Sequence, residues 1–222
     1  MDNALRLQYL EAMGIDVWIP KTASVELPHP SSFEAMSQDT WDLLKADITQ
    51  CTQCELCTSR EQPVLGSGNQ QADWMLITEA PGQDEAHQGE PLTGSADALL
   101  TEMLRAINLT RNDVFITNIT KCAPPKNRDP HVNEIENCNL FLQRQQQLLK
   151  PKIIIALGRV SAQALLKTNE PLAKLRNQVH ALNDTPIVVV YHPAYLLRFL
   201  PEKSKAWLDL TKALQTFTNN KG

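Results

Sequence analysis

The sequence predicts an α/β protein, a three-layer α/β/α sandwich around a central four-stranded parallel sheet. Four short runs rich in Val, Ile and Leu alternate with segments of helical periodicity. The runs are apolar almost throughout, which is typical of parallel strands whose two faces are both covered by helices. The expected strands are Trp74–Thr78, Val114–Asn118, Ile153–Leu157 and Ile187–Tyr191, and the expected helices are Ser95–Ile107, His131–Leu149, Val160–Leu166 and Lys205–Thr216.

Polar or glycine-containing turns follow all four expected strands. They occupy residues 78–82, the segment from 118 onward, residues 158–159 and residues 192–194. The carboxyl ends of parallel strands meet at one edge of a sheet, where such folds place their ligand sites. We therefore expect the functional loops at this edge.

The chain has 222 residues, 42% of them hydrophobic, which is enough for one domain and an extension. Residues 1–20 combine a short helical pattern with an extended apolar stretch, and residues 21–40 read as a flexible linker rich in Pro, Ser, Thr and Glu. Residues 41–222 form the expected main domain. No apolar run is long enough to span a bilayer and no signal-peptide pattern is present, so we expect a cytoplasmic protein.

The net charge of −4 is concentrated at the start of the chain. Residues 1–45 carry three basic and seven acidic side chains, and the remaining 18 basic and 18 acidic residues balance. The main domain is therefore neutral overall, and tight nonspecific binding to DNA is not indicated.

Four of the five cysteines form a candidate ligand set. Cys51 and Cys54 make a CxxC pair, and Cys122 and Cys138 follow beyond the first two expected strands. A CxxC pair alone is compatible with a redox pair, half of a zinc site, or inert buried thiols. Four thiolates suit tetrahedral zinc or an iron–sulfur cluster, and their spacing does not separate the two.

Five dispersed motifs follow one another along the chain. They are Cys-Thr-Gln-Cys-Glu-Leu-Cys-Thr-Ser-Arg at 51–60, Glu-Ala-Pro-Gly at 79–82, Gly-Glu-Pro-Leu-Thr-Gly at 89–94, Thr-Asn-Ile-Thr-Lys-Cys at 117–122 and His-Pro-Ala-Tyr-Leu-Leu-Arg at 192–198. In this order they resemble family 4 uracil-DNA glycosylases, which bind a [4Fe–4S] cluster. The resemblance implies that Cys51, Cys54, Cys122 and Cys138 hold the cluster and that Cys57 is a bystander.

The resemblance also implies roles for residues at the expected functional edge. Asn118 would recognise the uracil edge, His192 would stabilise the departing base anion, and Glu79 would stand beside the sugar and the attacking water. A loop would enter DNA, which makes single-stranded DNA a candidate partner. The implied base pocket comprises Thr78, Ala80, Pro81, Gly82 and Leu92, and the implied DNA-binding loop comprises Tyr195, Leu196, Leu197 and Arg198.

Four positions depart from the family pattern. Thr78 and Asp97 stand where the family usually has Gly, Leu92 replaces an aromatic residue, and Thr93 replaces an apolar one. Base–aromatic stacking contributes about 1–3 kcal/mol per base, or roughly 5- to 150-fold. We therefore expect weakened or lost base excision. The alternative is an active repair glycosylase for uracil or a related base, since Glu79, Asn118 and His192 are all present.

Residues 7–18 are similar to the amino-terminal segment of the psi subunit of bacterial DNA polymerase III, which binds the chi subunit of the clamp loader. The similarity implies a psi-like accessory protein with chi as its partner. The alternative is an amphipathic helix that folds back on the domain. The residues expected to enter a groove on chi are Tyr9, Leu10, Met13, Ile15 and Trp18.

Overall fold

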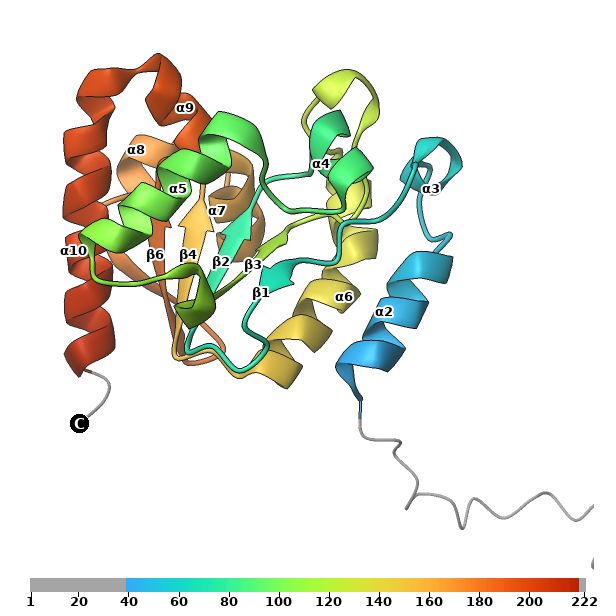
Figure 1. Cartoon of the computed structure of the whole chain (residues 1–222), viewed down its shortest axis with the longest axis horizontal. Helices are drawn as coiled ribbons and strands as arrows, with labels where there is room; N and C mark the ends of the chain where they lie inside the picture. The colour runs from blue at the N-terminus through green and yellow to red at the C-terminus, as the bar shows by residue number, and fades with distance from the viewer. Residues whose placement is uncertain (1–38, 220–222) are drawn as a thin grey trace, which may run out of the picture. The chain divides into compact units, whose positions relative to one another are not determined.

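A computed structural model of the chain describes residues 39–219 (Figure 1). The expected chi-binding segment 1–20, with Tyr9, Leu10, Met13, Ile15 and Trp18, lies outside the described residues, and so does nearly all of the expected linker. The described part is built on a six-stranded sheet with the strand order β1-β3-β2-β4-β6-β5.

The four central strands are parallel and confirm the four predicted ones. Their continuous apolar runs are buried along almost their whole length, as expected for strands covered on both faces. These strands are β2 (Trp74–Thr78), β3 (Val114–Asn118), β4 (Ile153–Leu157) and β6 (Thr185–Val190).

Two short antiparallel edge strands extend the sheet beyond the four predicted strands. β1 (Ser67–Gly68) pairs with β3, and β5 (Val179–Leu182) pairs with β6. β1 is two residues long, and β5 alternates exposed with half-buried residues, so neither has the continuous apolar run of a central strand. Asn183 and Asp184 join β5 to β6 with positive φ angles of 46° and 69°, as a tight hairpin requires.

Successive strand residues point to opposite faces of the sheet, and each face has its own apolar core and its own helices. One face packs against α5 (Gly94–Ala106), α9 (Pro193–Arg198) and α10 (Lys203–Asn219). The other packs against α6 (Val132–Leu149), α7 (Arg159–Leu166) and α8 (Leu172–Leu175). Figure 1 shows α5 and α10 together on one side of the sheet and α6 on the other, so the predicted three layers are confirmed.

Helix α2 (Trp41–Gln50) lies against α6, outside the sheet. Its buried Leu44 and Ile48 form a third apolar cluster with Phe141 of α6. Arg144 of α6 pairs with Asp39 at 2.6 Å, just before α2 begins. These contacts bring the end of α2 beside α6, and this end carries the first cysteine. The remaining short helices are α3 (Leu56–Ser59), α4 (Gln83–Gln88) and single 3-10 turns at Arg111–Asp113, Pro125–Asn127 and Leu200–Glu202.

The four long predicted helices are present with ends that differ by at most three residues. The short ones were not predicted, because four to six residues give too little periodicity to identify a helix. No helix among residues 39–219 is long and apolar enough to cross a membrane.

Helix α10 offers a matched test of the core. Leu210 is buried against the sheet, whereas Leu208 on the same helix is exposed. Leu210→Ala should lower the free energy of unfolding by about 2–5 kcal/mol, because it removes buried methyl groups and leaves a cavity. Leu208→Ala should change it by no more than about 0.5 kcal/mol. Urea denaturation measures both, and equal effects would contradict this packing of α10.

Candidate functional site

The carboxyl ends of β2, β3 and β6 bring the three sequence-predicted catalytic residues to one edge. Thr78 and Asn118 end neighbouring strands and pair in register, and the Ile119 amide donates to the Thr78 carbonyl at 3.0 Å. His192 follows β6, and its Nε2 lies 2.9 Å from the Thr78 hydroxyl. Glu79 is the first residue after β2. We call Glu79, Asn118 and His192 the edge triad.

His192 is held as a neutral hydrogen-bond donor. It caps the start of α9, where its Nδ1 accepts the Ala194 amide at 3.1 Å. The ring proton therefore resides on Nε2, which donates to the Thr78 hydroxyl. Burial lowers the pKa of His192, and the carboxylates of Glu79 and Glu85 oppose this shift in part.

Asn118 presents a free acceptor. Its side chain is 1% exposed, and its Nδ2 donates to the Pro91 carbonyl at 3.2 Å. Its Oδ1 is buried without a hydrogen-bond partner among the described residues. A buried acceptor left unpaired costs about 1–3 kcal/mol, so this atom is suited to receive a donor from a ligand.

Glu79 is fixed at the amino end of α7. Its Oε1 accepts the Val160 amide at 3.0 Å, where the helix dipole favours a negative side chain. Gly158 has a φ of +96°, and a Cβ there would lie 2.6 Å from Glu79 Oε1. Glycine is therefore required for the turn and for the carboxylate beside it. The second carboxylate oxygen of Glu79 has no hydrogen-bond partner within residues 39–219.

Glu85 of α4 is a site residue that the sequence analysis missed. Its Oε2 accepts the Gly82 amide at 3.1 Å, and its Oε1 accepts the Thr93 hydroxyl at 2.7 Å. It thereby ties the turn of Ala80, buried Pro81 and Gly82 to the start of α5. A carboxylate three residues after the residue that precedes a helix is a known capping signal, and it could have identified Glu85.

The four departures from the family pattern all fit the surrounding structure. Thr78 and Thr93 make the hydrogen bonds described above. Leu92 is buried in the core on the α5 side. The carboxylate of Asp97 forms an ion pair with Arg111, so its charge is balanced. The expectation that these residues disrupt the site finds no unpaired charge or clash to support it.

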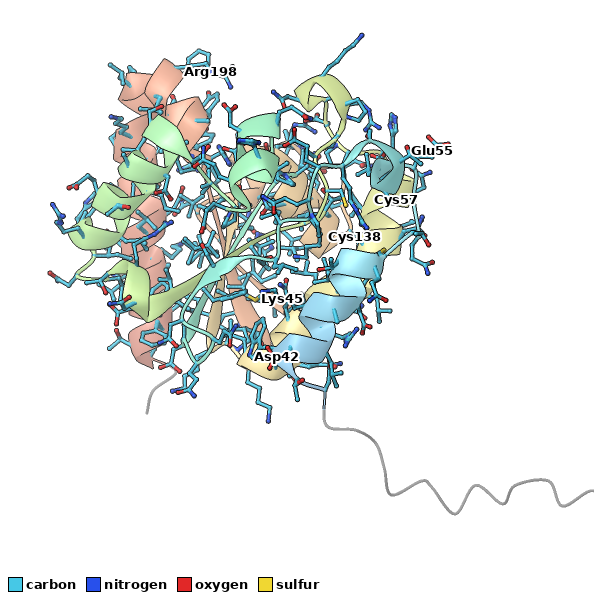
Figure 2. All side chains as sticks on the ribbon, turned by 45° about the vertical axis from the view of Figure 1, so that its right-hand side comes forward. Asp42, Lys45, Glu55, Cys57, Cys138 and Arg198 are labelled. Carbon is cyan, nitrogen blue, oxygen red and sulfur yellow. The ribbon has the colours of Figure 1, made fainter. Side chains whose placement is uncertain are left out.

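The predicted DNA-binding loop forms α9, and the prediction is wrong for two of its expected wedge residues, Leu196 and Tyr195. Leu196 is 1% exposed and belongs to the core, because α9 packs this residue inward against α5. The exposed apolar side chains are Leu197, Phe199 at 51% and Leu200 at 60%. Arg198, between Leu197 and Phe199 in the sequence, is also exposed, and Figure 2 shows it at the surface.

The exposed residues 197–200 form the tip of this region, and a row of four stacked side chains, here called the ladder, supports it. The Arg176 guanidinium lies 4.1 Å from the centroid of the Tyr191 ring. The ring centroids of Tyr191 and Tyr195 are 4.9 Å apart, and those of Tyr195 and Phe199 are 4.6 Å apart. Tyr195 is therefore an internal member of the ladder rather than a free wedge.

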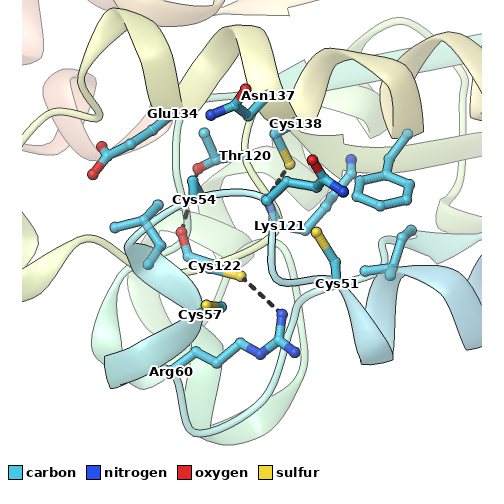
Figure 3. A pocket seen from close by; sticks show the side chains of 14 residues that line it. Cys51, Cys54, Cys57, Arg60, Thr120, Lys121, Cys122, Glu134, Asn137 and Cys138 are labelled. Atoms are coloured by element: carbon cyan, nitrogen blue, oxygen red, sulfur yellow. Dashed lines mark hydrogen bonds between the residues drawn. The ribbon is translucent and has the colours of Figure 1, made fainter.

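The four predicted ligand cysteines line one small pocket that is partly open to solvent, here called the cysteine cavity (Figure 3). Cys51 ends α2, Cys54 lies in the turn before α3, Cys122 follows β3 and Cys138 lies on α6. Cys57 of α3 lines the same cavity. The fold thus gathers thiols that are up to 87 residues apart, between Cys51 and Cys138.

The protein surrounds these sulfurs with hydrogen-bond donors. Arg60 Nη1 donates to Cys122 Sγ at 3.7 Å, and the Lys121 amide donates to Cys138 Sγ at 3.2 Å. Burial raises the pKa of Cys138 to about 11 and also raises the pKa values of Cys122 and Cys54. These thiols therefore keep their protons unless a metal replaces them. Among residues 39–219, no three His, Cys, Asp or Glu side chains are grouped closely enough for a single metal ion.

Comparison with known proteins identifies the family. Residues 65–212 match the uracil DNA glycosylase superfamily. The chain belongs to this superfamily. It is 37% identical to a type-4 uracil-DNA glycosylase of Archaeoglobus fulgidus, over 72% of this chain and 84% of the relative. Similar proteins with the same name in Saccharolobus solfataricus and Pyrobaculum aerophilum are 37% and 40% identical, covering 82% and 68% of this chain and 88% and 81% of theirs.

These relatives overturn the expectation of a psi-like accessory with weakened or lost excision. Proteins named as glycosylases are 37–40% identical over most of the chain, and nothing in the comparisons supports a clamp-loader role. The physical reason is that the substitutions read as damage to the site have partners in the fold. The presence of all three residues of the edge triad was therefore a better indicator of function than the four departures around it.

The buried environment of His192 gives a measurable pH signature. An NMR titration of the ring protons should report a pKa below the usual value of about 6.5, because burial disfavours the imidazolium. Below about pH 6.5 the unfolded chain would bind this proton more readily, so this residue lowers stability as the pH falls. A pKa above 6.5 would mean that the two nearby carboxylates outweigh burial.

Proposed function

We propose that this protein is a DNA repair glycosylase that excises uracil from DNA. The relatives that share most of its length carry the name uracil-DNA glycosylase. The observation that carries the proposal is the edge triad, above all the buried and unpaired Oδ1 of Asn118 at the same sheet edge as the Nε2 donor of His192. Together they offer one acceptor and one donor to a flat, polar ring.

Asn118 recognises the base. Uracil carries a donor at N3–H and a carbonyl acceptor at O4, and an amide side chain complements both. Oδ1 of Asn118 accepts N3–H, and Nδ2, which donates to the Pro91 carbonyl in the free protein, turns to O4. Cytosine has no proton at N3, so it would leave Oδ1 unpaired and be rejected.

His192 stabilises the departing base. Cleavage of the bond between C1′ and N1 leaves the electron pair on the uracil ring, with negative charge shared by its O2. A neutral imidazole with its proton on Nε2 donates to that oxygen without carrying a charge of its own. In the free protein the Thr78 hydroxyl oxygen accepts a hydrogen bond from this N–H group and keeps the ring oriented.

Glu79 orients the attacking water and accepts its proton. The carboxylate is anchored through Oε1 on the Val160 amide, and its second oxygen is available to accept a hydrogen bond from water. The water oxygen bonds to C1′ as the glycosidic bond breaks, and the proton it releases passes to the Glu79 carboxylate. The base must leave the stack to reach this edge.

Cys51, Cys54, Cys122 and Cys138 would hold a [4Fe–4S] cluster. Each thiolate of such a cluster binds a different iron, which calls for thiols spread around a cavity, as in this protein. A single zinc ion would need its four sulfurs within about 4 Å of one another, given Zn–S bonds of about 2.3 Å. When bound, the cluster cross-links α2, the turn before α3, the segment after β3 and α6.

The end of α9 is the proposed contact with single-stranded DNA. Exposed Leu197, Phe199 and Leu200 can fill the space left by a flipped base, while Arg198 is placed for a phosphate. This tip follows directly from His192, which starts α9. The proposed DNA contact and His192 of the edge triad therefore lie at opposite ends of the same short helix.

The cysteines provide a direct test of the cluster. Protein purified without oxygen should be brown and contain about four irons per chain. Cys54→Ser should lose most of the iron, because a hydroxyl is a poor iron ligand, whereas Cys57→Ser should keep it. Iron analysis and the visible absorption spectrum measure both variants. Stoichiometric zinc in a colourless protein would reject the cluster.

Excision is tested on a single-stranded oligonucleotide with one uracil, by alkaline cleavage of the abasic product. The wild-type protein should turn over repeatedly. Asn118→Ala should lower kcat/KM by about 10²- to 10³-fold, because it removes contacts to the base. Arg198→Ala should raise KM and leave kcat near wild type, since it only weakens the hold on phosphate. A wild-type protein that leaves uracil in place would refute the proposed function.

A further inference from the structure

Lys121 is a fully buried cation between the cysteine cavity and the edge triad. Its side chain is 1% exposed, and it directly precedes Cys122. Its Nζ donates three hydrogen bonds, at 2.6–2.8 Å, and every acceptor is neutral. The acceptors are the Thr117 hydroxyl, the Asn118 carbonyl and Gln145 Oε1.

This ammonium has no carboxylate partner within residues 39–219. Arg176 provides the contrast, because this buried guanidinium pairs with Asp209 at 2.6 Å. A buried charge is costly unless an opposite charge compensates it. Three neutral acceptors satisfy the hydrogen bonds of Lys121 but not its charge.

The nearest source of negative charge is the cysteine cavity. Lys121 itself lines the cavity, and its backbone amide donates to Cys138 Sγ at 3.2 Å. Four thiolates around an iron–sulfur cluster carry a net negative charge, which would supply the missing compensation.

The Lys121 ammonium also binds the end of β3, where the proposed base-recognition residue Asn118 lies. It binds the main-chain carbonyl of Asn118, the residue whose side chain carries the free acceptor. Through Gln145 it reaches α6, the helix that carries Cys138. A single side chain thus contacts elements of both sites. Figure 3 shows Lys121 among the cysteines.

We propose that Lys121 is the buried counter-charge of the cysteine-bound cluster and the positioning residue that couples the cluster to Asn118. The coupling to Asn118 rests on the proposed excision of uracil, whereas the counter-charge does not. A nearby cation favours the more negative, reduced state of a cluster, so Lys121 raises its midpoint potential. Loss of the cluster would in turn leave the ammonium uncompensated at the end of β3.

Two variants separate the charge of Lys121 from its hydrogen bonds. Lys121→Met removes both, whereas Lys121→Gln removes the charge and keeps an N–H donor for the Asn118 carbonyl. Lys45→Met is the matched control, because it removes the same charge from the exposed face of α2 (Figure 2). For each purified holoprotein, the readouts are the cluster midpoint potential, the rate of iron loss to a chelator, and kcat and KM for excision.

Both Lys121 variants should have a lower midpoint potential than wild type and lose iron faster, by roughly 10-fold or more, and Lys45→Met should match wild type. Lys121→Met should also lower kcat/KM by roughly 10- to 100-fold, with Lys121→Gln less affected. The midpoint potential and the rate of iron loss are measured without DNA. They therefore test the counter-charge even if the protein excises no uracil. If Lys121→Met does not fold, the midpoint potential, iron loss and kcat/KM of Lys121→Gln alone test the proposal. An unchanged potential in Lys121→Gln would overturn the counter-charge, and equal excision by Lys121→Met and wild type would overturn the coupling.

Discussion

The parallel pairing of β2 with β3 is the constraint on which both sites depend. It sets Thr78 opposite Asn118 and is closed by the hydrogen bond from the Ile119 amide to the Thr78 carbonyl. Beyond this point, one strand end supplies Asn118 to the edge triad and, four residues later, Cys122 to the cysteine cavity. A slip of one residue in this register would turn the side chains of β3 to the opposite faces of the sheet. The edge triad and the cysteine cavity would then be lost together.

The central sheet and the gathering of the edge triad were predictable from the sequence. Continuous apolar runs identify buried parallel strands, and the meeting of their carboxyl ends then places Glu79, Asn118 and His192 at one edge. The edge strands, the short helices and the burial of Leu196 were not predictable in this way. They depend on tertiary contacts, such as the packing of α9 on α5, that leave no periodic signal in a segment of six residues.

The error about activity has a related cause. The expectation of weakened excision treats each departure from the family pattern as an isolated change. The effect of each departure depends on a partner elsewhere in the chain. Thr78 meets His192, 114 positions away, and Asp97 meets Arg111, 14 positions away. Glu85, which receives the Thr93 hydroxyl, was not recognised as part of the site at all. A substitution can be judged only with the contacts that surround it.

The ladder from Arg176 through Tyr191 and Tyr195 to Phe199 has a consequence for how the protein meets a nucleic acid strand. Each ring is held by its neighbour, and Arg176 at its base is itself anchored by the buried Asp209. The exposed tip is therefore ordered before any strand arrives, and little conformational entropy remains to be lost on contact. Such a surface can release a strand and engage the next one without refolding, which suits the proposed excision of single bases scattered along DNA.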